Sequence, residues 1–138
     1  MYQKYFQVNV NEKRTRVKYP IQIYAEDAKS TVLEFYVEQN GKPYEFTEDD
    51  IVKLHVQDPS QKTTNREIVY TTQDDQNLVT FLADKKGYVR VTLGRSVVEL
   101  AGNKLECILE LFSQSDDEYS CRFPSFTIDI LPSSRGDL

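Results

Sequence analysis

The residue best suited to acid–base chemistry is His55, the single histidine of the chain. A histidine acting as general base needs a nucleophile within hydrogen-bond reach and a partner that orients the ring. No serine lies in a nucleophile-elbow pattern, and no second histidine could form another such pair. The alternation of Val52, Leu54 and Val56 with polar residues places His55 on the wet face of a strand. We therefore expect a surface histidine and predict no catalytic residue.

Acidic residues come in three groups, and paired carboxylates could hold Ca²⁺ or run glycosidase chemistry. The groups are Asp49-Asp50, Asp74-Asp75 and Asp116-Asp117-Glu118. None has the spacing of a calcium loop, and each falls in an expected turn, where Asp is favoured. Thr47 and Asp50 match a helix capping box, but the period-2 pattern that follows contradicts a helix. We predict no metal site.

Cys107 and Cys121 have neither metal-ligand spacing nor the density of a disulfide scaffold. Both fall in expected strands, so buried thiols are the simpler interpretation, and a cross-strand disulfide is the alternative. Whether the two lie close in space does not follow from the sequence. None of the five glycines belongs to a phosphate-binding loop, and we predict no cofactor.

The formal net charge of -5 counts against nucleic-acid binding, which requires a concentrated basic surface. The densest basic run, Lys13-Arg14-Thr15-Arg16-Val17-Lys18, is short and is followed by apolar and acidic residues. No apolar run approaches the roughly 20 residues of a membrane span, so we predict no membrane insertion. The 39% apolar and 28% charged residues are typical of a soluble globular protein.

The elements that would position these side chains are strands. In residues 30–57, two runs with period-2 alternation flank Asn40-Gly41-Lys42-Pro43, and Asn-Gly is a strong signal for a tight reversal. Further strands are predicted by alternation or apolar runs over 5–10, 17–24, 67–72, 78–83, 88–93, 119–123 and 126–130. The run over 78–83 alternates little, as in a strand covered on both faces.

Residues 94–112 fit either a long helix or a strand, because their apolar residues match both periods. Gly102-Asn103 interrupts the helical pattern, so we predict a short helical turn over 96–101 and a strand over 104–112. About eight or nine short strands with frequent turns favour an all-β, antiparallel, immunoglobulin-like β-sandwich. We predict one domain over 1–132 and a flexible tail or linker over 133–138.

The order of these motifs resembles the N-terminal domain family of phage baseplate upper proteins. TVLEFYVEQNGKPYEFT (31–47) and IVKLHVQDP (51–59) resemble the family's strand, Asn-Gly-x-Pro turn and following strand. DKKGYVRVTL (84–93), AGNKLECILELF (101–112) and FPSFTIDIL (123–131) resemble its later strands. Phe46 stands where the family usually has an aliphatic residue. The resemblance covers about residues 5–132.

This resemblance implies a non-enzymatic adaptor in the tail baseplate of a siphophage or prophage of Gram-positive bacteria, made in the host cytoplasm. The expected partners are the distal tail hub, receptor-binding proteins and further copies of the chain. Tyrosine supplies large contact area with few rotatable bonds, so Tyr2, Tyr5 and Phe6 are the candidate interface residues. Their alternative role is that of ordinary strand residues.

Two other functions fit a β-sandwich. A carbohydrate-binding module needs aromatic rings on one exposed face, which Tyr36, Tyr44, Tyr70 and Tyr88 could supply, although Trp is absent. A hydrolase needs two carboxylates that converge across a cleft.

Overall fold

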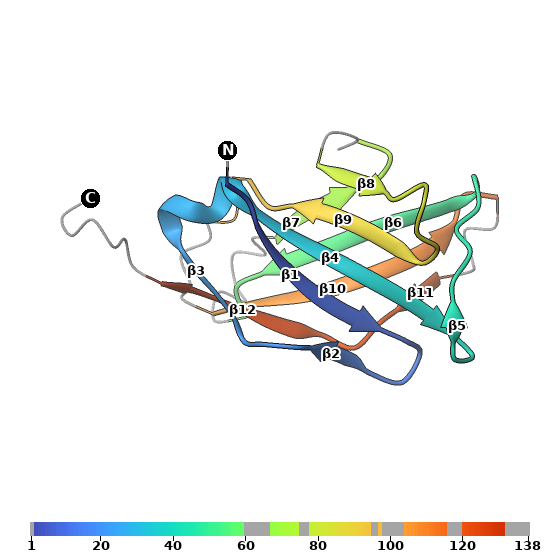
Figure 1. The fold of residues 1–138 in the computed structure, drawn as a ribbon, viewed down its shortest axis with the longest axis horizontal. Coiled ribbons are helices and arrows are strands. Elements are labelled where there is room, and N and C mark those ends of the chain that lie inside the picture. The colour runs from blue at the N-terminus through green and yellow to red at the C-terminus, as the bar shows by residue number, and fades with distance from the viewer. Residues whose placement is uncertain are drawn as a thin grey trace.

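Two mixed six-stranded sheets form the protein, as a sandwich-like pair (Figure 1). The computed structural model describes residues 2–59, 67–74, 78–94, 97, 104–115 and 120–131. The described strands are β1 (Lys4–Val10), β2 (Thr15–Val17), β3 (Ile21–Tyr24), β4 (Thr31–Gln39), β5 (Lys42–Pro43), β6 (Asp50–Gln57), β7 (Glu67–Thr71), β8 (Val79–Phe81), β9 (Tyr88–Thr92), β10 (Lys104–Ser113), β11 (Ser120–Arg122) and β12 (Phe126–Leu131). One 3₁₀ helix, η1 (Ala25–Ser30), precedes β4.

The first sheet has the order β2-β1-β4-β9-β8, and β5 pairs with β4. Figure 1 shows β1 and β4 side by side and running in the same direction, and their register pairs Val8 with Phe35. The other pairs of this sheet are antiparallel. Because partnered residues face the same side, Val8, Phe35 and Val89 share the inner face.

The second sheet has the order β3-β12-β10-β6-β7, and β11 pairs with β10. β3 runs parallel to β12, whereas the other pairs are antiparallel. The chain passes from the first sheet to the second between β2 and β3, and Pro20 lies in this crossover. A residue without an N–H fits here, because both strands are at the edges of their sheets.

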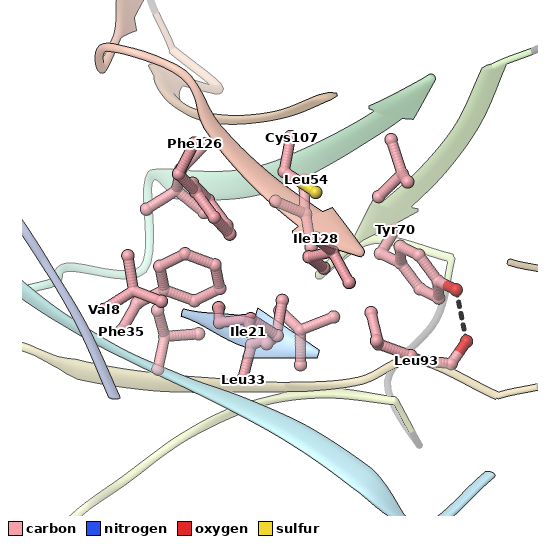
Figure 2. Close-up of a cluster of buried hydrophobic side chains, with 14 of the residues drawn as sticks. Val8, Ile21, Leu33, Phe35, Leu54, Tyr70, Leu93, Cys107, Phe126 and Ile128 are labelled. Atoms are coloured by element: carbon pink, nitrogen blue, oxygen red, sulfur yellow. Dashed lines mark hydrogen bonds between the residues drawn. The ribbon is translucent and has the colours of Figure 1, made fainter. Parts of the chain in front are cut away.

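The core fills the space between the inner faces of the two sheets. Figure 2 shows Val8, Leu33 and Phe35 from the first sheet opposite Leu54, Phe126 and Ile128 from the second. The rings of Phe35 and Phe126 meet edge to face, with centroids 5.8 Å apart. Phe35, Leu33, Leu54 and Ile128 are each 0% exposed, so the alternation in the sequence identified the buried faces correctly.

The prediction of an all-β sandwich is confirmed, but two of its details are wrong. Twelve strands are described instead of eight or nine, because short strands such as β2 and β5 carry too few residues to show a period. The sheets are mixed instead of antiparallel, because β1–β4 and β3–β12 pair in parallel. The expected immunoglobulin-like topology is not shown.

The strand over 78–83 was also predicted incorrectly. β8 is an edge strand, and Thr80 and Phe81 are exposed, so it is not covered on both faces. The predicted strand over 104–112 is confirmed as β10, with period-2 burial along its length. Of the predicted helical turn over 96–101, only Val97 lies within the described residues, and it is buried.

Backbone angles confirm the predicted reversal at Asn40-Gly41. Asn40 and Gly41 have φ of 54° and 76°, as a tight hairpin requires. Gly87 has a φ of 84° and lies against β4, where its carbonyl accepts a 2.7 Å hydrogen bond from the Val37 amide. The division into a domain over 1–132 and a tail over 133–138 stays a prediction.

Candidate interaction surfaces

His55 lies on the outer face of the second sheet, as predicted, but in the centre of a charged cluster. Its Nδ1 is 2.6 Å from Glu67 Oε1, and its Nε2 is 2.8 Å from Glu110 Oε1. Ser120 donates a hydrogen bond of 2.9 Å to the other oxygen of Glu110. The hydroxyl thus contacts the carboxylate instead of the imidazole, so this cluster does not activate a serine nucleophile. Its hydrogen bonds join β6, β7 and β10.

The environment of Glu110 favours its charged form. Burial by itself raises the pKa of this carboxyl group, but hydrogen bonds from His55 and Ser120 and the charges of Arg122 and His55 outweigh it. The net result is a pKa below the usual value for Glu. The contacts of Glu110 therefore favour its carboxylate form on the outer face of the sheet.

Asp50, from the first of the three acidic groups, stabilises a turn. Asp50 accepts hydrogen bonds from the Thr47 amide at 2.8 Å and from the Tyr44 hydroxyl at 3.1 Å. Its amide donates to the Thr47 carbonyl at 3.1 Å. The apparent capping box is therefore a turn that leads into β6, as expected. Among the described residues, no group of three or more His, Cys, Asp or Glu could hold a metal ion. Asp75 and 116–118 lie outside the described residues.

Both cysteines are free thiols. Cys107 is buried in the core beneath β10, and Cys121 on β11 pairs in register with Leu111. Leu111 is four residues along β10 from Cys107, roughly 13 Å in an extended strand, which is too far for a disulfide. Burial and, to a lesser extent, Glu106 raise the pKa of Cys107 far above its ordinary value. Burial and Glu12 also raise the pKa of Cys121.

The four tyrosines considered for carbohydrate binding do not gather on one face. Tyr70 is buried, and its hydroxyl donates to the Leu93 carbonyl (Figure 2). Tyr44 is half-buried beside Asp50. Only Tyr36 and Tyr88 pair on the outer face of the first sheet, with ring centroids 5.0 Å apart. The four rings therefore do not form the single exposed aromatic face that the carbohydrate-binding hypothesis requires.

The candidate interface residues Tyr2, Tyr5 and Phe6 lie at the start of the chain and of β1. Tyr2 is 82% exposed and Tyr5 is 50% exposed, whereas Phe6 is half-buried and packs against the core. The Arg90 guanidinium lies over the Tyr5 ring, 5.0 Å from its centroid. Arg90 in turn donates a 2.7 Å hydrogen bond to Glu34. Tyr5 is thus held on the outer face of the first sheet.

Sequence reasoning missed a groove of about 780 Å³ between the β5–β6 loop, the end of β7 and the β8–β9 turn. Phe46 and Phe81 line it, with ring centroids 4.8 Å apart, and Glu45 and Lys86 form a 2.9 Å ion pair beside them. A signal was present in Phe46, which stands where the resembled family has an aliphatic residue. Phe81 gave none, because its strand was expected to be covered.

Comparisons with known proteins agree with this architecture. The sequence model of the BppU N-terminal domain matches residues 2–137. Among solved structures, the N-terminal domain of phage TP901-1 ORF48 is similar, with a TM-score of 0.63 over 94% of this chain and 98% of that one. At 12% identity this likeness shows the shared fold. No curated protein matches. In the described residues no helix has the length and apolarity needed to cross a bilayer.

The family match over residues 2–137 covers nearly the whole chain. The chain therefore belongs to the BppU N-terminal domain family, and it is a non-enzymatic structural component of the phage baseplate, in the virion tail.

Proposed function

We propose that this domain is an adaptor that docks on the central tail hub and supports the receptor-binding proteins that attach the phage to its host. It assembles with the distal tail hub protein, with receptor-binding proteins and with further copies of itself. The domain is made in the cytoplasm of the host and then enters the tail. Family membership supports the baseplate role.

The observation that carries the docking proposal is the exposure of Tyr2 and Tyr5 at the start of β1, beside Arg90. Tyr and Arg are the residue types most enriched at the energetic centres of protein interfaces. Tyr5 is also held in place by Arg90, so little side-chain entropy is lost when a partner covers it. Tyr2, Tyr5 and Phe6 are the proposed contact residues.

Co-purification and calorimetric titration with the hub protein encoded by the same phage test this proposal. We expect Tyr2→Ala/Tyr5→Ala to weaken hub binding by about tenfold or more, since truncation of a central interface tyrosine costs at least about 1–2 kcal/mol. Phe6 is left unchanged because it packs on the core, and its truncation would lower stability as well.

Tyr24→Ala is the matched control. Tyr24 is 39% exposed and lies on β3 of the second sheet, so its truncation removes an equivalent ring from another surface. We expect hub affinity to be unchanged in this variant. Equal affinity of the wild type and the Tyr2/Tyr5 variant for the hub would contradict the assignment of these residues. Absence of any hub binding by the wild-type domain would overturn the docking proposal.

A further inference from the structure

Four cations lie close together on the β1–β2 hairpin of an otherwise acidic chain. They are Lys13, Arg14, Arg16 and Lys18, within six consecutive residues of a chain with a formal charge of -5. Val17 packs against the core, so the strand period directs Arg16 outward, and Lys18, the residue after β2, is also exposed. Without these four charges the formal charge of the chain is -9, from -5 minus 4. The hairpin is therefore a local basic surface.

Three adjoining hollows follow this hairpin and share lining residues. The first, of about 380 Å³, lies beside the turn and is lined by Lys13, Arg14 and Arg16. The second shares Arg16 with the first and contains Lys18. The third shares Lys18 with the second and ends at Tyr5 and Tyr19. The shared residues make the three hollows neighbours along β1 and β2, and we call them together the basic groove.

Charge within the basic groove is not balanced by the described residues. Lys4, Arg90 and Lys86 pair with Asp27, Glu34 and Glu45, but no described residue forms an ion pair with Lys13, Arg14, Arg16 or Lys18. Glu38 is the one acidic residue among the described residues that line the three hollows. The groove therefore has positive charge available for a partner.

Local hydrogen bonds hold the hairpin in a defined shape. The Asn11 side-chain oxygen accepts from the Lys13 amide at 2.8 Å and from the Arg14 amide at 3.0 Å. The Thr15 hydroxyl donates to the Pro124 carbonyl, which ties β2 to the second sheet. A surface whose backbone is already ordered loses less entropy on binding.

We propose that the basic groove binds an acidic, extended segment of a neighbouring baseplate protein. Arg16 lies on β2, with Arg14 two residues before it and Lys18 two residues after it, and two residues of extended chain span about 6.6 Å. Carboxylates at alternate positions of an extended peptide have the same interval, so each can meet one cation. Tyr5 and Tyr19, the latter 68% exposed, offer apolar contact at the end of the groove. The inference that this segment belongs to another baseplate protein rests on the proposed function.

Fluorescence polarisation with the whole chain and a labelled peptide of alternating glutamate and serine tests the groove. We expect binding that weakens as salt rises, because ionic strength screens exposed charges. Arg16→Glu/Lys18→Glu should reduce affinity by about tenfold or more, since it places like charges opposite the peptide. Circular dichroism and thermal melting check that both strands of the hairpin are retained.

Lys29→Glu/Lys42→Glu is the matched control, because it changes the formal charge by the same amount at two exposed residues that do not line the groove. We expect this variant to bind the peptide within about twofold of the wild type. Equal loss in both variants would mean that net charge alone governs binding and would overturn the proposal. The proposal would also be overturned if the wild type did not bind the peptide. It would likewise be overturned if the wild type bound inorganic polyphosphate more tightly than the peptide and Arg16→Glu/Lys18→Glu abolished that binding.

The two proposals fail in different ways. Suppose that the hub binds the domain, but Arg16→Glu/Lys18→Glu changes neither the affinity for the peptide nor the affinity for the hub. The groove proposal is then wrong, and the docking proposal is retained. If the peptide binds in the groove as expected but the hub does not bind the domain, the docking proposal is wrong and the groove stands.

Discussion

His55 lies diagonally across the β6–β10 ladder from Glu110, with its Nε2 atom 2.8 Å from Oε1 of that carboxylate. Its other ring nitrogen faces Glu67 on β7. His55 lies on β6, between the two strands that carry these carboxylates. Its two contacts thereby link the edge strand β7 and the strand β10 across β6.

The first prediction concerns the carboxylate of Glu110. Glu110→Gln should lower the free energy of unfolding at pH 7 by about 1–2 kcal/mol, because hydrogen bonds to charged groups contribute more than neutral ones. Urea denaturation followed by circular dichroism measures this difference. Glu106→Gln is the control: Glu106 lies on the same face of β10 and accepts one hydrogen bond, from Gln57. We expect Glu106→Gln to lower the free energy of unfolding by less than half as much as Glu110→Gln does.

The effect of Glu110 should depend on pH. Its pKa is lower in the folded protein than the usual value for Glu, so its stabilisation is complete above the pKa of the unfolded carboxyl, about 4.3. That stabilisation is lost as the pH falls through the pKa of the folded state. The stabilities of the wild type and Glu110→Gln should therefore converge below about pH 4. A stability difference that stayed constant from pH 7 to pH 3 would show that the carboxylate charge contributes nothing.

The second prediction compares two glycines with positive φ. Gly87→Ala should destabilise the protein more than Gly41→Ala by about 1–3 kcal/mol. Both substitutions place alanine in a left-handed conformation. At Gly87 the new Cβ would also lie 2.8 Å from the Val37 carbonyl oxygen, whereas at Gly41 it would meet nothing within 4 Å. Thermal unfolding of the two variants measures the difference, and equal melting temperatures would contradict a clash at Gly87.

The third prediction concerns the buried hydroxyl of Tyr70. Tyr70→Phe should lower the free energy of unfolding by about 1 kcal/mol, because the Leu93 carbonyl loses this donor. Tyr19→Phe, at a tyrosine that is 68% exposed, should change stability by less than about 0.5 kcal/mol. Equilibrium urea unfolding of both variants tests the pair. If the two substitutions had the same effect, the Tyr70 hydrogen bond would not stabilise the fold.

The fourth prediction concerns thiol reactivity. Cys107 is 0% exposed and its pKa is raised, so it should react with Ellman's reagent only when the chain opens. In Cys121→Ser, labelling in buffer at pH 8 should be about a hundredfold or more slower than in concentrated urea. Cys107→Ser reports the half-buried Cys121 by itself and should label faster in buffer. Rapid labelling of Cys107 in the folded protein would contradict its burial.

Residues 30–57, which contain β4, β5 and β6, show what local pattern can predict. Alternation of apolar residues identified β4, β6 and their inner faces, because a strand buried on one side must repeat every two residues. Asn40-Gly41 predicted the reversal between β4 and β5, because both residues accept positive φ. These features depend on neighbours in the sequence.

The pairing of strands could not be predicted in the same way. A half-buried strand has the same alternation whether its partner is parallel or antiparallel, so nothing in Phe6 or Val8 indicated that β1 pairs in parallel with β4. The edge position of β8 was missed for a related reason. Its apolar residues predicted burial, but Phe81 lies 40% exposed beside Phe46.

The sequence by itself determined that this chain is all-β, where most strands lie, which face of most of these strands is buried, and which family its motifs resemble. Only the tertiary structure decided which residues, far apart in the sequence, contact one another. His55 was expected on an outer face, but Glu67 and Glu110 reach it from strands 12 and 55 residues away. The residues of the hairpin were visible as a basic run, yet their groove forms only where β1, β2 and β4 meet. Local pattern follows from burial of one strand face, whereas sites depend on contacts between segments whose pairing that pattern does not encode.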